Sequence, residues 1–454
     1  MQPYFDDSLP AFVAALMPLL DKTTIEASVV LRDASGRLAL ITSQPLPPDQ
    51  RTTVLTALTR QLPAYSRGER TLLDHTQPGV ATILRQTRPY IERIHVDHEP
   101  PVHVHLVEQR IVGQDWLTQP APGWQPPAPM RLVFASLKGG VGRSTALAVV
   151  AAELARLGRK VLVIDLDLEA PGIGSMLLAP DELPPFGLLD AYVESGLGGI
   201  NREFLLDMTA PSRFGRGKGL IDVAPAAGSR TQNHPGHFLA KIARAYLENT
   251  DPSGVAISFL EQSRRLIDEL SNLKAYDAIL IDARSGLNET TAAAILGLGA
   301  DVLLFGEGTP QTIASYRYLL AHLARFPRQG DDDWLYRLRM VHAKAPEDAS
   351  RQEAFRDAAF GVFTEFLYRD QPLLAETGEP LLDDDDNALL VEEFSLDARE
   401  APHYAWPVLR DANYYYGDPL SDPALLEPIR YERSYAALLA GVMERLGADS
   451  GPRP

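Results

Sequence analysis

The sequence contains no cysteine among its 454 residues. Disulfides, thiolate-held metal or iron–sulfur sites and cysteine nucleophiles are therefore all excluded for these residues. Positive charge is also in deficit, because 43 Lys and Arg face 60 Asp and Glu, for a formal net charge of −17. This balance argues against a protein whose whole surface binds nucleic-acid phosphates or anionic lipid, and it leaves a local basic patch open.

Long apolar runs are missing as well. No stretch approaches the roughly 20 apolar residues that a helix needs to cross a bilayer. Residues 1–22 are acidic before a short apolar stretch, whereas a secretory signal begins with basic residues. We therefore expect a cytoplasmic protein, and its 45% hydrophobic content can fill the cores of two or three domains.

Proline is concentrated at residues 118–130, where it rules out a helix or a central strand and predicts a semi-rigid linker. Residues 1–117 form the first region, and their pattern predicts a small α+β domain. Its expected elements are helices at 9–21 and 49–62, a hairpin around residues 34–36, and a strand at 102–112. Behind the linker we expect a nucleotide-binding core at 131–345 and an extension at 346–454 that completes it.

Within the core, apolar segments typical of strands alternate with helices. Expected strands cover residues 131–137, 160–167, 276–283 and 301–308, and an alanine-rich helix covers 144–157. Near-continuous apolar strands separated by helices are typical of a parallel sheet with helices on both faces. The sequence therefore predicts an α/β fold with a doubly wound, mostly parallel sheet.

A glycine-rich loop joins the first of these strands to the alanine-rich helix. It reads Lys138, Gly139, Gly140, Val141, Gly142, Arg143, Ser144 and Thr145. Glycines let successive backbone N–H groups turn toward phosphate oxygens, and the helix N-terminus adds unpaired donors and partial positive charge. An ordinary glycine-rich turn would not need this strand–loop–helix setting. The segment predicts a phosphate-binding loop, in which the Ser144 hydroxyl can reach Mg²⁺.

This loop resembles the deviant Walker A motif, KGGxGK[ST]T, of the ParA/MinD-type ATPases, and the resemblance extends over roughly residues 130–345. It implies a P-loop NTPase fold of the SIMIBI/ParA-like kind that binds ATP and Mg²⁺. It also implies that Lys138 reaches the nucleotide of a second subunit across an ATP-dependent homodimer. Ser144 would coordinate Mg²⁺.

Arg143 departs from the motif, because the family has a lysine on the β- and γ-phosphates at this position. Arginine keeps the charge and can bind phosphate through its fork, but its guanidinium is larger and more rigid than an ammonium. We expect nucleotide binding to survive. Hydrolysis is expected to be slow, because the stabilisation of the transition state depends on where that charge is placed.

Two carboxylates follow the second strand, at Asp165 and Asp167. Alternate residues of a strand share a face, so both can point into one crevice. They resemble the family's DxD motif, which implies that Asp165 lies near the water shell of Mg²⁺ and that Asp167 positions the attacking water. The alternative is that they only cap the next segment.

Asp282 ends the strand at 276–283 and resembles the Walker B aspartate, which holds the hydration shell of Mg²⁺. The family often continues as DTPPG, whereas here Ala283, Arg284, Ser285 and Gly286 follow. Arg284 would thus face the γ-phosphate region. It either joins Arg143 around the phosphate or pairs with a nearby carboxylate, and the second arrangement is the default.

Two later segments resemble the family's contacts to the nucleotide base. Pro310 falls in a segment similar to the proline loop near adenine. Residues 339–346 fall where the family has a strand ending in Asn-Lys or Asn-Arg, whose asparagine reads the adenine edge. That asparagine is missing here, and His342 or Lys344 is the candidate substitute. Adenine rather than guanine is therefore an expectation from the resemblance alone.

Four histidines gather at residues 95–105. If residues 99–101 are the turn of a hairpin, His95 lies opposite His105 and Asp97 opposite His103, all on one face, as a metal site would need. Exposed strand histidines without a ligand role are commoner, and we expect no metal here.

Three tyrosines, Tyr414–Tyr416, are similar to the tyrosine clusters of bacterial kinases that share this core. We expect a packed aromatic turn instead, because the chain does not end in this cluster. The amphipathic helix at 431–447 lacks the basic face of a membrane anchor, so we expect it to cover the sheet.

Together these features predict an ATPase that acts as a slow molecular switch, dimerises with ATP–Mg²⁺ and regulates a partner, in a bacterial regulatory or defence system. Residues 1–117 are the expected dock for that unknown protein partner. One alternative is a nucleotide-dependent scaffold that barely hydrolyses ATP because of Arg143. Another is a kinase-like transferase on the same core. The overall acidity disfavours DNA as the cargo.

Overall fold

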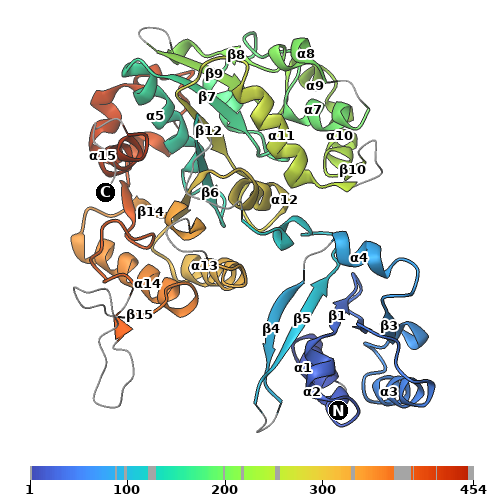
Figure 1. Cartoon of the computed structure of the whole chain (residues 1–454). Coiled ribbons are helices and arrows are strands. Elements are labelled where there is room, and N and C mark those ends of the chain that lie inside the picture. Colours follow the sequence, from blue (N-terminus) through green and yellow to red (C-terminus); the bar gives the residue numbers. More distant parts are fainter. Residues whose placement is uncertain are drawn as a thin grey trace. The chain divides into compact units, whose positions relative to one another are not determined.

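The computed structural model describes residues 3–86, 89–96, 100–120, 129–197, 200–215, 219–250, 256–328, 333–372, 390–391, 393–415 and 417–447. Its contacts divide the chain into two compact units, residues 1–117 and 118–454 (Figure 1). Most of the predicted linker, residues 121–128, lies outside the described residues. The two units are considered in turn.

The first unit contains a mixed five-stranded sheet in the order β3-β2-β1-β5-β4. Its elements are α1 (Phe5–Leu16), α2 (Lys22–Glu26), β1 (Val29–Arg32), β2 (Leu38–Thr42), α3 (Pro48–Gln61), β3 (Leu72–Asp74), α4 (Val80–Gln86), β4 (Tyr90–Ile94) and β5 (Val102–Glu108). The hairpin of β1 and β2 and the helix α3 confirm the sequence predictions. A core of buried residues from α1, α3 and the sheet holds this unit together.

The first helix begins and ends earlier than predicted. Asp6 and Asp7 lie in its first turn, where carboxylates interact favourably with the positive end of the helix dipole. The helix ends at Leu16, although Met17 keeps helical backbone angles, because the next residue, Pro18, has no N–H to continue the helical hydrogen bonds.

The predicted register of the histidine hairpin is wrong. Strand β4 does pair with β5 in an antiparallel manner, but Ile91 lies opposite His105 and Arg93 opposite His103. Strand β4 already ends at Ile94, so His95 has no partner in the ladder, and the connection is longer than the three-residue turn assumed. Asp97 and His98 lie outside the described residues. Among the described residues, no group of three or more His, Asp or Glu side chains is arranged to hold a metal ion.

The second unit is built on an eight-stranded sheet in the order β17-β14-β13-β6-β12-β7-β9-β8, in which every pair is parallel except β8 with β9. Its strands are β6 (Met130–Ser136), β7 (Lys160–Asp165), β8 (Ala210–Pro211), β9 (Leu220–Ala224), β12 (Ala278–Asp282), β13 (Asp301–Gly306), β14 (Leu338–Ala345) and β17 (Trp406–Leu409). The predicted α/β fold with a mostly parallel sheet is confirmed.

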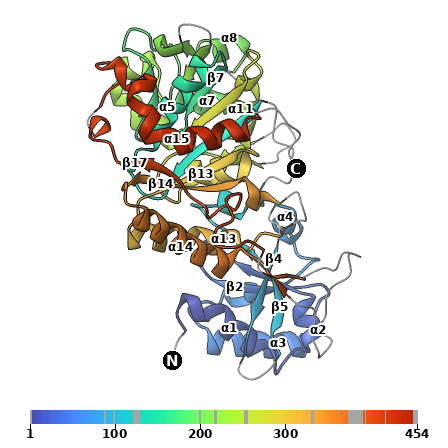
Figure 2. The same cartoon turned by 90° about the vertical axis from the view of Figure 1, so that its left-hand side faces the viewer.

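Helices cover both faces of this sheet. The long ones are α5 (Arg143–Arg156), α11 (Phe259–Ser271), α13 (Pro310–Leu323), α14 (Ala349–Phe366) and α15 (Pro428–Arg445). Figures 1 and 2 place α5 beside α15, and Figure 1 places α11 and the short α12 (Glu289–Ala292) across the sheet from α5. Helix α5 is buried from Ala146 to Ala152 because it lies between the sheet and α15.

Strand β9 was not predicted, although it pairs with β7 along its whole length. Its middle residue is Asp222, which interrupts an otherwise apolar run. The Asp222 carboxylate is buried, accepts a hydrogen bond from the Tyr276 hydroxyl at 2.8 Å and pairs with Lys274. In the described ranges no helix combines the length and apolar character that spanning a membrane requires.

Candidate functional site

The glycine-rich loop connects β6 to α5 at the carboxyl edge of the sheet. Gly140 and Gly142 have φ angles of 73° and 89°, a region that favours glycine. A Cβ atom at either position would meet nothing within 4 Å, so the loop leaves open space above its backbone. Helix α5 begins at Arg143 with Gly142 as its N-cap, and its first N–H groups therefore face this space. The geometry is that of a phosphate-binding loop.

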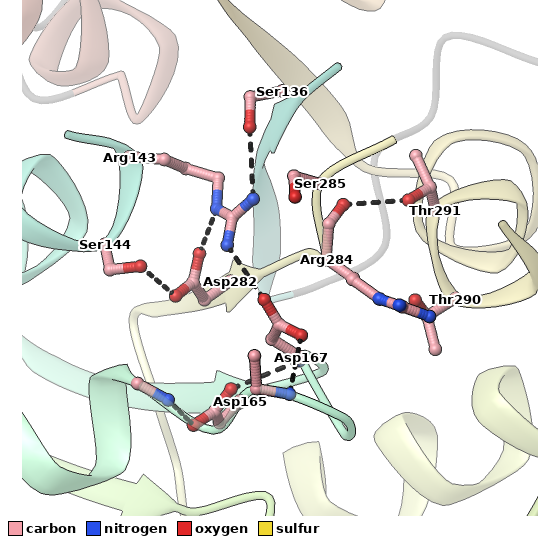
Figure 3. Close-up of polar contacts among 12 residues, drawn as sticks. Ser136, Arg143, Ser144, Asp165, Asp167, Asp282, Arg284, Ser285, Thr290 and Thr291 are labelled. Carbon is pink, nitrogen blue, oxygen red and sulfur yellow. Dashed lines mark hydrogen bonds and ion pairs between the residues drawn. The ribbon is translucent and has the colours of Figure 1, made fainter. Parts of the chain in front are cut away.

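Arg143 is turned into the crevice and is 8% exposed. Its Nε donates to Asp282 Oδ1 at 2.5 Å, and its other nitrogens donate to Ser136 Oγ at 3.1 Å and Asp167 Oδ2 at 3.4 Å (Figure 3). The second oxygen of Asp282 accepts the Ser144 hydroxyl at 2.6 Å. The predicted phosphate-binding residue, the predicted Mg²⁺ ligand and the Walker B-like aspartate thus form one network.

Asp165 ends β7 and is completely buried. Its carboxylate accepts backbone N–H groups of Asp167 at 3.2 Å, Gly172 at 3.2 Å and Gly174 at 3.3 Å. Burial, and then the nearby Asp282 charge, raise the pKa of Asp165 to about 8. Asp165 therefore anchors the loop that follows β7.

Asp167 lies just beyond the strand and is 8% exposed. Its Oδ1 accepts the Ala170 N–H at 3.2 Å, while Oδ2 faces Arg143. Burial raises the pKa of Asp167, and the Arg143 charge opposes that rise. Both aspartates accept hydrogen bonds from the backbone of the loop, as expected if they cap the segment after β7. Asp167 in addition faces the crevice through its contact with Arg143.

Arg284 pairs with Glu169, so the structure has the default arrangement expected for this arginine. Glu169 belongs to the loop after β7, and Arg284 to the loop after β12. The charge of Arg284 also acts on Asp167, whose pKa it lowers. Glu169 carried no signal in the sequence beyond its place two residues after Asp167.

Lys138 differs from Arg143 in its burial. It is exposed at the rim of the loop, and its ammonium makes no ion pair with any residue in the described ranges. A side chain in this position is free to contact a second molecule.

At the other end of the crevice, Lys344 reaches back to the glycine-rich loop. Its Nζ donates to the Gly140 carbonyl at 2.6 Å and pairs with Glu307 at 2.9 Å. Lys344 has a φ of 49°, the one positive value at a non-glycine residue within the described part of the chain. The pairing of β14 with β17 shifts between His342 and Ala345. Such bulges re-aim side chains, and this one directs Lys344 at the loop.

His342 is not available to read a base, and that expectation is wrong. It is 3% exposed and stacks on Phe355, with ring centroids 4.1 Å apart. Burial lowers the pKa of His342 to about 4. In a regular strand, His342 and Lys344 would point to the same face because they are two residues apart. The bulge between them breaks this alternation, so Lys344 reaches the glycine-rich loop while His342 stays in the core. Pro310 is the first residue of α13 and is exposed next to the end of β13.

A pocket that is open to solvent lies beside the glycine-rich loop. Sequence reasoning missed it, because much of its wall comes from the segment after β14. Its lining residues are Val141, Gly142, Thr145, Phe305, Lys344, Val408, Leu409, Arg410, Asp411, Tyr414, Tyr415 and Tyr435. Tyr414 packs edge-on against Tyr435 and Tyr415 is 50% exposed, while Tyr416 lies outside the described residues.

The crevice fits a magnesium–polyphosphate group. It combines open space over Gly140 and Gly142, the N-terminus of α5, and the Ser144 hydroxyl next to the Asp282 carboxylate. A hydroxyl and a carboxylate are oxygen donors of the kind that Mg²⁺ prefers. This donor set and the mostly parallel sheet match the P-loop NTPase fold.

Comparison with known proteins makes the assignment more specific. A family model described as "ParA: NUBPL iron-transfer P-loop NTPase" matches residues 129–188. An iron–sulfur cluster carrier protein of Methanocaldococcus jannaschii is 35% identical over 79 residues, which are 17% of this chain and 27% of that relative. The matched part thus spans about a quarter of the relative's length. The predicted resemblance to ParA/MinD-type P-loop ATPases is confirmed.

Solved structures give a weaker likeness. A ParA protein of pNOB8 bound to nonspecific DNA is 17% identical with a TM-score of 0.40, over 71% of this chain and 99% of that one. The cell-division ATPase MinD of Pyrococcus furiosus is 17% identical with a TM-score of 0.41, over 70% and 99%.

Proposed function

We propose that this chain is an ATP-driven switch that binds ATP–Mg²⁺, closes a homodimer and hydrolyses the nucleotide slowly. The observation that carries the proposal is the network of Arg143 with Asp282 and Asp167. A polyphosphate in the loop competes with these carboxylates for the guanidinium. When Arg143 moves onto phosphate, Asp282 is released toward Mg²⁺ and Asp167 toward water. One crevice thus has two charge arrangements, and the nucleotide selects between them.

The roles follow the positions of the side chains. Ser144 would coordinate Mg²⁺ and Asp282 would hold its hydration shell, while Asp165 keeps the loop after β7 in place through backbone N–H groups. Asp167 orients the attacking water, and Arg143 neutralises charge on the phosphates. When bound, Mg²⁺ would screen the phosphate charges against these carboxylates. The exposed Lys138 extends to the nucleotide of the second subunit.

The base occupies the pocket formed by the glycine-rich loop, Lys344 and residues 408–415. Aromatic Tyr414 and Tyr415 suit a planar ring. Adenine is the proposed base from the family resemblance.

Light scattering of the full chain with ATP–Mg²⁺, with ADP and with neither tests the switch, with phosphate release followed in the same samples. A dimer with ATP only and slow release is the expected result. Lys138→Ala should bind ADP normally and lose the ATP-dependent dimer. A normal dimer from this variant would refute the role of Lys138 between subunits.

A scaffold that holds ATP without turnover is the second candidate, and the buried Arg143–Asp282 pair favours it. Breaking a buried ion pair costs several kcal/mol, so Asp282 could stay bound to Arg143 throughout. Under this candidate, phosphate release stays at background in the wild type and rises in Arg143→Lys. Residues 1–117, as a separate compact unit, are the proposed partner-binding region in either case.

A further inference from the structure

The loop that carries Arg284 is built directly against the phosphate-binding loop. The Ala283 N–H donates to the Phe134 carbonyl and the Gly286 N–H to the Ser136 carbonyl, each at 3.0 Å. Ser285 Oγ lies 3.6 Å from the position that a Cβ on Gly139 would occupy. Arg284 is therefore held between two anchored residues, next to the place where phosphates would lie.

Arg284 is the last cation in a row of alternating charges. Asp282, Arg143 and Asp167 form the first part of the row. Arg284, labelled in Figure 3, follows; its charge acts on Asp167, and its guanidinium pairs with Glu169. The arginines and carboxylates of this crevice thus compensate one another, and a polyanion must displace carboxylates to reach either arginine.

The two arginines differ in how easily they can be displaced. The side chain of Arg284 is 30% exposed and that of Glu169 is 36% exposed. Ion pairs in contact with water contribute little to stability, whereas the fork of arginine binds phosphate oxygens in two parallel hydrogen bonds. A phosphate group can therefore replace Glu169 at little cost. The backbone would stay in place, because the Arg284 carbonyl accepts the Thr291 hydroxyl at 2.8 Å.

We propose that Arg284 binds the terminal phosphate of a nucleoside triphosphate within its own subunit and is held by Glu169 until that phosphate arrives. The transfer releases the Glu169 side chain, while Asp165 keeps the loop after β7 anchored. Arg284 thereby distinguishes a triphosphate from a diphosphate. This inference rests on the proposed nucleotide-binding function and adds a residue that senses the γ-phosphate.

Calorimetric titration of the full chain tests it, with Mg²⁺ and either ADP or a non-hydrolysable ATP analogue. Arg284→Gln should weaken binding of the analogue about tenfold or more and change ADP binding by less than about twofold. The affinity of Arg284→Lys for the analogue should lie between those of the wild type and Arg284→Gln, because lysine keeps the positive charge but lacks the forked guanidinium. Glu169→Gln should tighten the analogue several-fold.

Arg264→Gln is the matched control, since Arg264 also forms a two-pronged pair with a glutamate, Glu261, on the surface of α11. It should change neither affinity. If Arg284→Gln weakened ADP and the analogue equally, Arg284 would only support the loop. If it weakened neither, Arg284 would not contact the nucleotide. Either outcome overturns the inference about Arg284 but not the proposal that the wild-type chain binds nucleotide. A wild-type chain that binds neither nucleotide would refute the proposed function itself.

Discussion

The two ends of the crevice are built from different chemistry. At the phosphate end, charged side chains at the ends of β7 and β12 bond to the glycine-rich loop, as Asp167 and Asp282 do to Arg143. At the base end, aromatic and aliphatic side chains form a pocket around Lys344. The phosphate end therefore resists rearrangement through ion pairs, and the base end through packing. The predictions below test this difference.

Removing Asp282 should have the largest effect, because it leaves Arg143 buried with one carboxylate fewer. We expect Asp282→Ala to lower the free energy of unfolding by about 3–5 kcal/mol, measured by chemical denaturation. Asp397→Ala is the control, since Asp397 is 79% exposed beside Arg356 and should change the stability by less than about 1 kcal/mol. Equal losses in the two variants would show that burial does not distinguish the phosphate end.

A buried histidine of β14, which does not line the base pocket, should show its effect through pH. The pKa of His342 is lowered to about 4 in the folded chain, below its ordinary value of 6.5, because burial disfavours the charged ring. The unfolded chain takes up this proton first, so the stability from His342 is complete above about pH 6.5 and is lost as the pH falls toward 4. The loss should reach about 3 kcal/mol in denaturation curves.

His342→Gln should remove that part of the pH dependence, whereas His103→Gln, which alters an exposed histidine of the first unit, should keep it. If His342→Gln and the wild type lose stability in parallel between pH 6.5 and 4, the buried neutral histidine is not the cause.

The smallest effect is expected at Tyr415, half exposed at the mouth of the pocket. Tyr415→Ala should weaken ATP binding by about fivefold, as the loss of one ring contact implies, and should leave inorganic triphosphate binding unchanged. If Tyr415→Ala weakened triphosphate binding as much as ATP binding, Tyr415 would contact the phosphates. The two ends of the crevice would then not be separate. Fluorescence titration of both ligands provides the measurement.

The same division explains what the sequence could predict. Phosphate chemistry requires glycines, a helix start and carboxylates at strand ends, and these occur at fixed spacing between Lys138 and Asp167. The central strands were predictable because they are apolar throughout. Strand β9 was missed because Asp222 interrupts it.

The base end could not be predicted, because stacking and apolar contact are possible for many side chains and its residues lie far apart in the chain. Phe305, Lys344 and Tyr414 meet only after the sheet is assembled. A bulge in β14 decided between His342 and Lys344, and the register of one strand pair is not written in local sequence. Arg284 was visible as a departure from the family, but its partner Glu169 was not.

The position of helix α15 near the end of the sequence determines how late in translation helix α5 can be covered. The Tyr431 hydroxyl of α15 bonds to Glu153 of α5 at 2.7 Å, and Tyr435 of the same helix lines the base pocket. A ribosome must therefore translate beyond residue 435 before α5 is covered and a nucleotide can be held at both ends. Until then the nascent chain exposes the side of α5 that α15 covers in the folded protein, and such exposed apolar surface favours aggregation.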